Sequence, residues 1–211
     1  MENNLSLPEK LFLLCIKPNK GGLVGGGAFP VQYSIIASII KELELQGNIR
    51  IDNNYIEIKS FKNDDPLYEF VLSKFKKFDK PLKIPRWFNR LYYSLKHIKG
   101  ELKSRLIDKR LIRIESRKFL FFKYKNTCLL EKSLVREMVD KVSNSIYRGK
   151  VENDWKFIVS VVEPAGLLSR IFPERQSRKN ARRRLKQMKL DCDITVALKK
   201  AIAGTRAALA S

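Results

Sequence analysis

The most regular pattern of apolar positions in the chain lies between residues 87 and 123. Apolar residues recur there at steps of three and four, the spacing of one helical face: Leu91, Leu95, Ile98, Leu102 and Leu106. A second face beside it carries Lys96, Lys99, Lys103 and Arg110. We therefore predict one helix that packs its apolar stripe on the core and presents the adjacent cations to solvent.

This helix is followed by the run RLIRIESRKFLFF, whose apolar residues lie on both sides of Ser116–Arg117. Such runs are typical of β-strands, so we predict a hairpin over Ile112–Lys123 with its turn at Ser116–Arg117. A second hairpin is predicted in GNIRIDNNYIEIK, around Asp52–Asn54, because apolar and polar residues alternate on both sides of the turn residues.

Similar patterns predict the remaining helices. Ser6, Pro8 and Glu9 have the spacing of a capping box with proline in the first turn. The helices are expected over Leu5–Ile16, Val31–Gln46, Pro66–Phe78, Lys132–Tyr147, Trp155–Val162, Glu174–Lys189 and Ile194–Leu209. Together these elements predict a mainly α fold, a single compact helical domain over residues 1–211 with two or more small β-hairpins.

Two segments of the chain resemble each other. Leu45–Ile58 and Asp108–Phe122 each contain a helix end, then Ile-Arg-Ile and an acidic residue, then a hairpin. An internal duplication and a chance match are equally compatible with this likeness, because helix–hairpin units are common.

Charge changes the picture most. The 211 residues include 43 Lys plus Arg against 22 Asp plus Glu, a net charge of +21. A net charge of this size gives no information about the fold. It predicts a polyanionic partner, either nucleic acid or an anionic membrane surface. Two basic segments stand out, Arg86–Arg110 and Arg170–Lys189. Aromatic residues accompany the first, and we expect at least one of Tyr92 and Tyr93 in the core.

Little in the sequence indicates catalysis. The single histidine, His97, lies among surface lysines, and Cys15, Cys128 and Cys192 are far apart, without the spacing of a zinc site. The loop PNKGGLVGGGAFP lacks the GK[S/T] ending of a phosphate-binding loop, so a mobile surface loop is expected. We predict a protein without enzymatic activity, metal or cofactor.

The N-terminus does not have the pattern of a secretory signal, and no apolar run approaches the roughly 20 residues of a membrane span. Three cysteines without pairing signals favour a reducing compartment. We therefore expect a cytoplasmic protein that associates with a membrane, if at all, from its surface.

Three stretches of the sequence resemble the Golgi phosphoprotein 3 family. They are LSLPEKLFLLCI at the N-terminus, IIKELELQGNIRID after the glycine-bearing loop, and the run from Lys96 to Phe122 that ends in LIDKRLIRIESRKFLFF. The resemblance extends in order from Leu5 to the C-terminal helix, where it rests mainly on helix pattern. It implies a mostly helical domain that binds membranes peripherally through phosphatidylinositol 4-phosphate. It also implies recognition of the cytoplasmic tails of membrane proteins.

The same resemblance implies a headgroup site. The family's pair of arginines, three residues apart, falls on Lys96 and Lys99, which keep the spacing but replace guanidinium groups with point charges. The family's loop tryptophan falls near Gly27 and its further arginine near Ile36, two departures that favour general anionic-lipid binding over strict selectivity. We include Lys103, Arg86 and Arg90 in the predicted headgroup site because they are cations near Lys96 and Lys99 in the sequence. The hairpin residues Phe119, Leu120 and Phe121 are expected to contact the membrane or a second copy of the chain.

Two functions follow from these observations. The first is a peripheral membrane protein that recognises anionic phospholipid headgroups, with tails of membrane proteins and self-association as further expected partners. The alternative is a non-specific nucleic-acid-binding protein that uses the basic surface helix 174–189, which carries eight basic residues against one acid over Glu174–Lys189.

Overall fold

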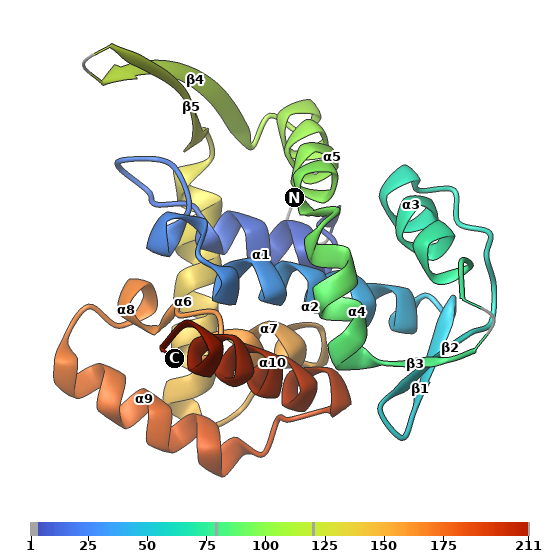
Figure 1. Cartoon of the computed structure of the whole chain (residues 1–211). Helices are drawn as coiled ribbons and strands as arrows, with labels where there is room; N and C mark the ends of the chain where they lie inside the picture. The colour runs from blue at the N-terminus through green and yellow to red at the C-terminus, as the bar shows by residue number, and fades with distance from the viewer. Residues whose placement is uncertain (1–3, 79, 120, 211) are drawn as a thin grey trace.

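The computed structural model describes residues 4–78, 80–119 and 121–210. Helices make up most of it, and two small antiparallel sheets complete it (Figure 1). The mainly α fold with small hairpins is therefore confirmed. The helices in chain order are α1 Leu7–Cys15, the 3-10 helix η2 Val24–Gly27, α2 Phe29–Leu45, α3 Pro66–Phe75, α4 Ile84–Tyr92, α5 Leu95–Asp108, α6 Lys132–Arg148, α7 Asn153–Val161, α8 Leu168–Ile171, α9 Arg175–Met188 and α10 Asp193–Ala210.

The strands form two separate sheets. β1 (Ile49–Asp52), β2 (Tyr55–Ile58) and β3 (Leu82–Lys83) lie in the order β1-β2-β3, and β4 (Ile112–Phe119) pairs with β5 (Phe122–Leu129). The sequence predicts neither β3 nor α8, because two and four residues are too short to show a period.

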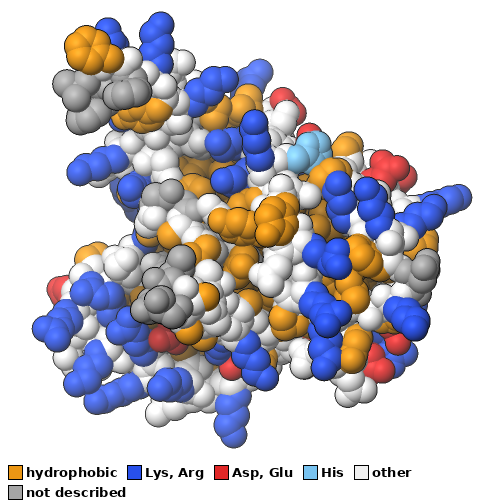
Figure 2. All heavy atoms as spheres, in the orientation of Figure 1, with side chains coloured by type: hydrophobic (Ala, Val, Ile, Leu, Met, Phe, Trp, Pro, Cys, Tyr) orange, Lys and Arg blue, Asp and Glu red, His pale blue; other side chains and the backbone are white. Residues whose placement is uncertain are grey.

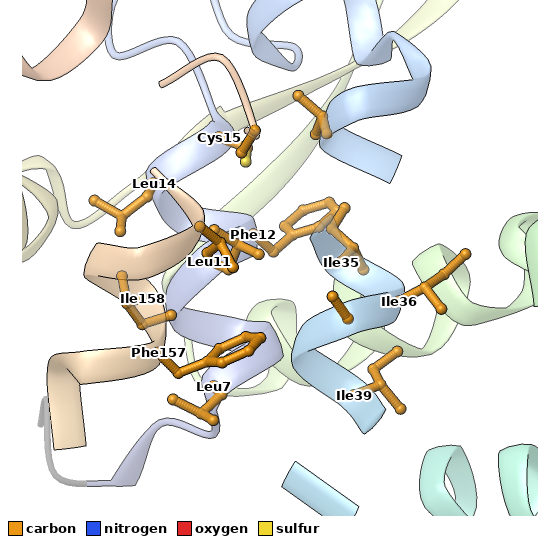
Figure 3. Packing of buried hydrophobic residues seen from close by; sticks show 14 of the residues in the cluster. Leu7, Leu11, Phe12, Leu14, Cys15, Ile35, Ile36, Ile39, Phe157 and Ile158 are labelled. Carbon is orange, nitrogen blue, oxygen red and sulfur yellow. The ribbon is translucent and has the colours of Figure 1, made fainter. Parts of the chain in front are cut away.

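The core is built around α1 and α2. Every residue of α1 is buried, including Glu9 and Lys10, and α2 buries ten of its residues. Phe157 and Ile158 of α7 pack beside Leu7 and Leu11 of α1, with the isoleucines of α2 on the other side (Figure 3). α10 lies against α2 and α4. α1 is thus a core helix that is buried on all sides.

A capping network joins α1 to the end of α5. The Ser6 backbone N–H donates to Glu9 Oε2 at 2.8 Å, as the capping-box spacing predicts. Glu9 is almost completely buried, and Lys109 Nζ lies 2.7 Å from its Oε1. A buried carboxylate needs such partners, so this pair fixes the C-terminal end of α5 over the N-terminus of α1.

The central helix is interrupted, in contrast to the single helix predicted. α4 ends at Tyr92 and α5 begins at Leu95, and the Ser94 N–H donates to the Leu91 carbonyl at 3.0 Å in a tighter turn. Tyr and Ser have lower helix propensities than Leu or Lys, so Tyr-Tyr-Ser favours a continuous helix less than the residues on either side. The apolar stripe survives it, since all five of its residues are buried.

Arg110 does not share the helical face assigned to it, because α5 ends two residues earlier and Arg110 has a φ of +57°. Gly47 occupies the same place after α2, with a φ of +74°. In both joints the next N–H donates back into the last helical turn, from Asn48 to Leu43 O and from Leu111 to Leu106 O. The two helix–hairpin joints therefore share one capping geometry.

The β4–β5 hairpin is longer than predicted, and its turn was placed wrongly. Ser116 pairs with Lys125 and Phe119 with Phe122, so Ser116–Arg117 lie inside a strand and the hairpin ends at Leu129. Alternate residues of a strand share a face, and Glu115 is held there by Arg113 and Arg117 at 2.7 and 2.9 Å. These ion pairs favour a continuous strand.

The first part of the glycine loop is docked on this hairpin and is not a free surface loop. The Gly22 N–H donates to Thr127 O at 2.8 Å, and Asn126 Nδ2 donates to Lys20 O at 2.8 Å. A Cβ on Gly21 would lie 2.8 Å from Thr127 O, and the φ of Gly21 is +64°. Only glycine fits this close approach without a shift.

Candidate functional site

The cations of α5 meet a further cation from the hairpin. Lys96 is exposed, and Lys99 and Lys103 are half-buried one turn and two turns along the same helix. Burial lowers the pKa of Lys103, and the positive charges of Lys99 and of Lys125 on β5 lower it further. We call Lys96, Lys99, Lys103 and Lys125 the α5 basic cluster.

Lys125 was missed by the sequence analysis. The hairpin was expected to end at Lys123, so Lys125 had no assigned place beside α5. The signal was present in the run Lys123-Tyr124-Lys125, where two cations alternate as they do on one face of a strand. Its proximity to Lys103 depends on how the hairpin leaves α5, which no local pattern specifies.

Arg86 and Arg90 lie in a different place from the α5 lysines. They line a groove of about 580 Å³ between α3 and α4 together with Lys74 and Lys77, and none of the α5 lysines lines it. The Arg90 guanidinium lies 3.9 Å from the centre of the Phe78 ring. The five predicted headgroup residues thus divide into two basic surfaces.

An aromatic patch lies at the junction of α4 and α5. Trp87 and Phe88 are buried, whereas Tyr93 is 89% exposed and Tyr92 is 39% exposed. The rings of Tyr92 and Tyr93 lie 6.3 Å apart, and Tyr33 of α2 lies 5.7 Å from Tyr92. The expectation that one of the two tyrosines belongs to the core is wrong, because both follow the last buried position of α4.

The tip of the β4–β5 hairpin exposes an apolar residue among cations. Phe121 is 91% exposed, and Lys118 and Lys123 are paired across the strands beside it. The hairpin projects from the body of the molecule (Figure 1). Leu120 lies outside the described residues, and of Phe119 only the backbone, in β4, is described.

The base of the hairpin is held by charge. Hydrogen bonds from Arg117 and Arg113 lower the pKa of the Glu115 carboxyl to about 2. This carboxylate therefore stays charged over the whole physiological range, and it neutralises part of the positive charge of β4 close to the body. The uncompensated lysines lie nearer the tip.

The sequence of this chain matches the model of a known family. The family model of Golgi phosphoprotein 3 (GPP34) matches residues 7–205. The chain belongs to the Golgi phosphoprotein 3 family. No individually curated protein gives a significant match. Among the residues that the structure describes, no helix is long and apolar enough to cross a membrane.

The resemblance places the family's further arginine near Ile36, which carries no charge and is completely buried in α2. Gly27 ends η2 in the loop before α2 and has no side chain to contribute. In this member of the Golgi phosphoprotein 3 family, the cations of the candidate site come from α5 and the hairpin.

The other basic segment forms a surface helix, as the sequence predicts. Within α9 only Ala181 is buried, and Leu185 and Met188 are half-buried. Arg182 pairs with Glu163 at 3.4 Å, and most other cations of this helix face solvent.

The single histidine, His97 of α5, makes a structural contact. The centre of its ring lies 4.1 Å from that of Phe70.

Proposed function

We propose that this Golgi phosphoprotein 3 family member is a peripheral membrane-binding protein without enzymatic activity. In this proposal the α5 basic cluster binds anionic phospholipid headgroups, including phosphatidylinositol 4-phosphate. Phe121 at the hairpin tip enters the interfacial region as a second anchor, which stable membrane attachment requires.

The crowding of Lys99, Lys103 and Lys125 is the observation that carries this proposal. Within the described ranges, no ion pair joins these lysines to a carboxylate. Like charges held together without a counter-charge destabilise the free protein, and an anion bound between them reverses that cost. The hairpin supplies one of the three charges, so headgroup binding and tip insertion would act on the same side of the molecule.

We also propose the partners that family membership suggests. Tails of membrane proteins would bind while the protein rests on the cytoplasmic face of a membrane, and the projecting hairpin would support association between copies of the chain.

Binding of nucleic acid remains a second candidate because of α9. Lys179, Arg183 and Lys186 are all exposed on this helix. Such a surface can follow a phosphate backbone without reading sequence, and its affinity would fall steeply with salt.

Charge reversal separates the two candidates. The variant Lys99→Glu/Lys103→Glu/Lys125→Glu is compared with Lys179→Glu/Arg183→Glu/Lys186→Glu, which changes the net charge equally. Each lysine near an anionic bilayer contributes about 1 kcal/mol, so the first variant should lose roughly a hundredfold or more in liposome affinity. The second variant should bind liposomes nearly as well as the wild type.

The measurement is co-sedimentation of nuclease-treated protein with anionic liposomes, alongside the A260/A280 ratio before and after a high-salt wash. Equal losses in both variants would contradict a site on α5. Loss of nucleic-acid binding in the α9 variant alone, with no liposome binding by the wild type, would favour the second candidate.

A further inference from the structure

A cavity away from α5 combines an apolar lining with four cations. It measures about 460 Å³ and lies between the loop after α1, the first half of α6, and α8. Its volume falls in the range of roughly 300–1,000 Å³ that small-molecule sites occupy. None of the residues of the α5 basic cluster lines it.

One face of α6 supplies much of the lining. Lys132, Val135, Arg136 and Val139 follow the three- and four-residue spacing of a single helical stripe. Val24 and Leu129 extend the apolar surface from the loop and from the end of β5. The cavity therefore has an apolar wall with two cations on the same helix.

Two further cations, Lys17 and Arg170, complete the set of four, and no Asp or Glu is among the lining residues. Arg170 Nε is buried and has no hydrogen-bond partner in the described part of the protein. An unpartnered buried N–H costs free energy, and a partly buried guanidinium without a counter-charge adds to that cost.

The surroundings of Arg170 do not supply the missing charge. The Cys15 thiol lies near it, but burial raises the pKa of Cys15 to about 12, so the thiol is neutral at physiological pH. Burial also lowers the pKa of Arg170 from its usual value. Among the described lining residues no carboxylate faces Arg170, and an anion from solution would provide the counter-charge.

We infer that this cavity binds a single-chain amphipathic anion, an aliphatic chain that carries a carboxylate or phosphate headgroup. The chain would lie against the valines of α6 and Leu129, and the headgroup would accept hydrogen bonds from Arg170 and Arg136. A free fatty acid and a lysophospholipid share this chemistry. The inference does not depend on membrane binding by α5, since the two sites share no residue.

Isothermal titration calorimetry of the delipidated full chain tests the inference. The probes are dodecanoate and lysophosphatidic acid below their critical micelle concentrations, with acetate as headgroup alone and dodecanol as chain alone. We expect binding of at least one amphipathic anion, and much weaker binding of acetate and dodecanol. The amphiphile that binds more tightly identifies the headgroup. If neither amphiphile binds, or if dodecanol binds as well as dodecanoate, the inference is wrong.

Two variants locate the site. Arg170→Met removes a partly buried side chain and can also affect folding, so Arg136→Met provides an independent test. Each should reduce affinity roughly tenfold or more, the effect of losing a charged hydrogen bond. The control Arg148→Met removes a cation from the far end of α6, outside the cavity, and should leave affinity unchanged. Loss of binding in the α5 triple reversal, with Arg170→Met and Arg136→Met unaffected, would overturn the assignment.

Discussion

At the residue scale, Lys103 shows how a functional charge acts against stability. Its ammonium group is partly buried, and this burial together with the charges of Lys99 and Lys125 lowers its pKa. A lysine with a lowered pKa in the folded state loses its proton more readily there. The folded protein therefore gains stability from this group as pH rises from the lowered pKa toward 10.5, and carries the penalty at neutral pH.

The variant Lys103→Gln should consequently be more stable and bind anions less well. Each like-charge neighbour costs about 0.2–0.5 kcal/mol, so the free energy of unfolding should rise by about 0.5–1 kcal/mol. Urea denaturation and liposome co-sedimentation measure the two effects. Lys96→Gln, with an exposed side chain on the same helix, is the stability control. A less stable Lys103→Gln protein would show that Lys103 contributes favourable packing and not repulsion.

Gly21 is a residue at which no side chain fits. An alanine Cβ would lie 2.6 Å from Asn126 Nδ2 and 2.8 Å from both Cys128 Sγ and Thr127 O, in a conformation with positive φ. We expect Gly21→Ala to lower the free energy of unfolding by at least about 2 kcal/mol, measured by urea denaturation. Gly25→Ala is the matched control, since its φ is also positive but its nearest contact is an ordinary 3.7 Å. Equal effects of the two substitutions would show that backbone strain, not contact with β5, sets the cost.

At the scale of elements, the β4–β5 hairpin connects the body of the molecule to its proposed membrane anchor. Its base is held by the docked loop and by the ion pairs of Glu115, and its tip carries Phe121 between Lys118 and Lys123. A firm base and an exposed apolar tip suit an element that inserts into a membrane interface.

The variant Phe121→Ser should therefore weaken liposome binding without affecting the fold. Full burial of a phenylalanine side chain contributes about 1.5–3 kcal/mol, so affinity should fall roughly tenfold or more. Because Phe121 is exposed in the free protein, the melting temperature should stay unchanged. Tyr147→Ser is the control, since Tyr147 is 74% exposed on α6. If both variants bind equally to liposomes, the hairpin tip is not an anchor.

Periodic elements and the hairpin around Asp52–Asn54 were predictable from the sequence, whereas the turn and the length of the β4–β5 hairpin were not. All seven helices expected outside the central segment are present, and the stripe from Leu91 to Leu106 is buried as predicted. The hairpin turn falls next to Phe121 without glycine, asparagine or proline to mark it, whereas Ser116–Arg117 looks more like a turn. The prediction gave more weight to the turn-forming residues Ser116–Arg117 than to the alternation of residues along the strand. It therefore ended the hairpin at Lys123 and did not place Lys125 beside α5.

At the scale of the whole molecule, packing between segments that are far apart in the sequence determines where the candidate basic surfaces lie. The charge of +21 predicts a polyanion but not where it binds. Lys and Arg side chains outnumber Asp and Glu over the face in Figure 2, around an apolar region at its centre. The division of the predicted cations between α5 and the groove of Arg86 and Arg90 depends on the packing of α3 against the central helices, which no local pattern specifies.

Liposome co-sedimentation of the wild-type protein is the most direct test of membrane binding by the α5 basic cluster. One set of liposomes contains phosphatidylinositol 4-phosphate and the other phosphatidylglycerol at matched surface charge. Because the cations of the cluster are lysines, which bind phosphate as point charges, we predict similar binding to both sets, weakening as salt screens the cluster. A strong preference for the phosphoinositide would contradict a site governed by charge alone. Absence of binding to both sets would contradict the proposal that this protein is a membrane-binding member of its family.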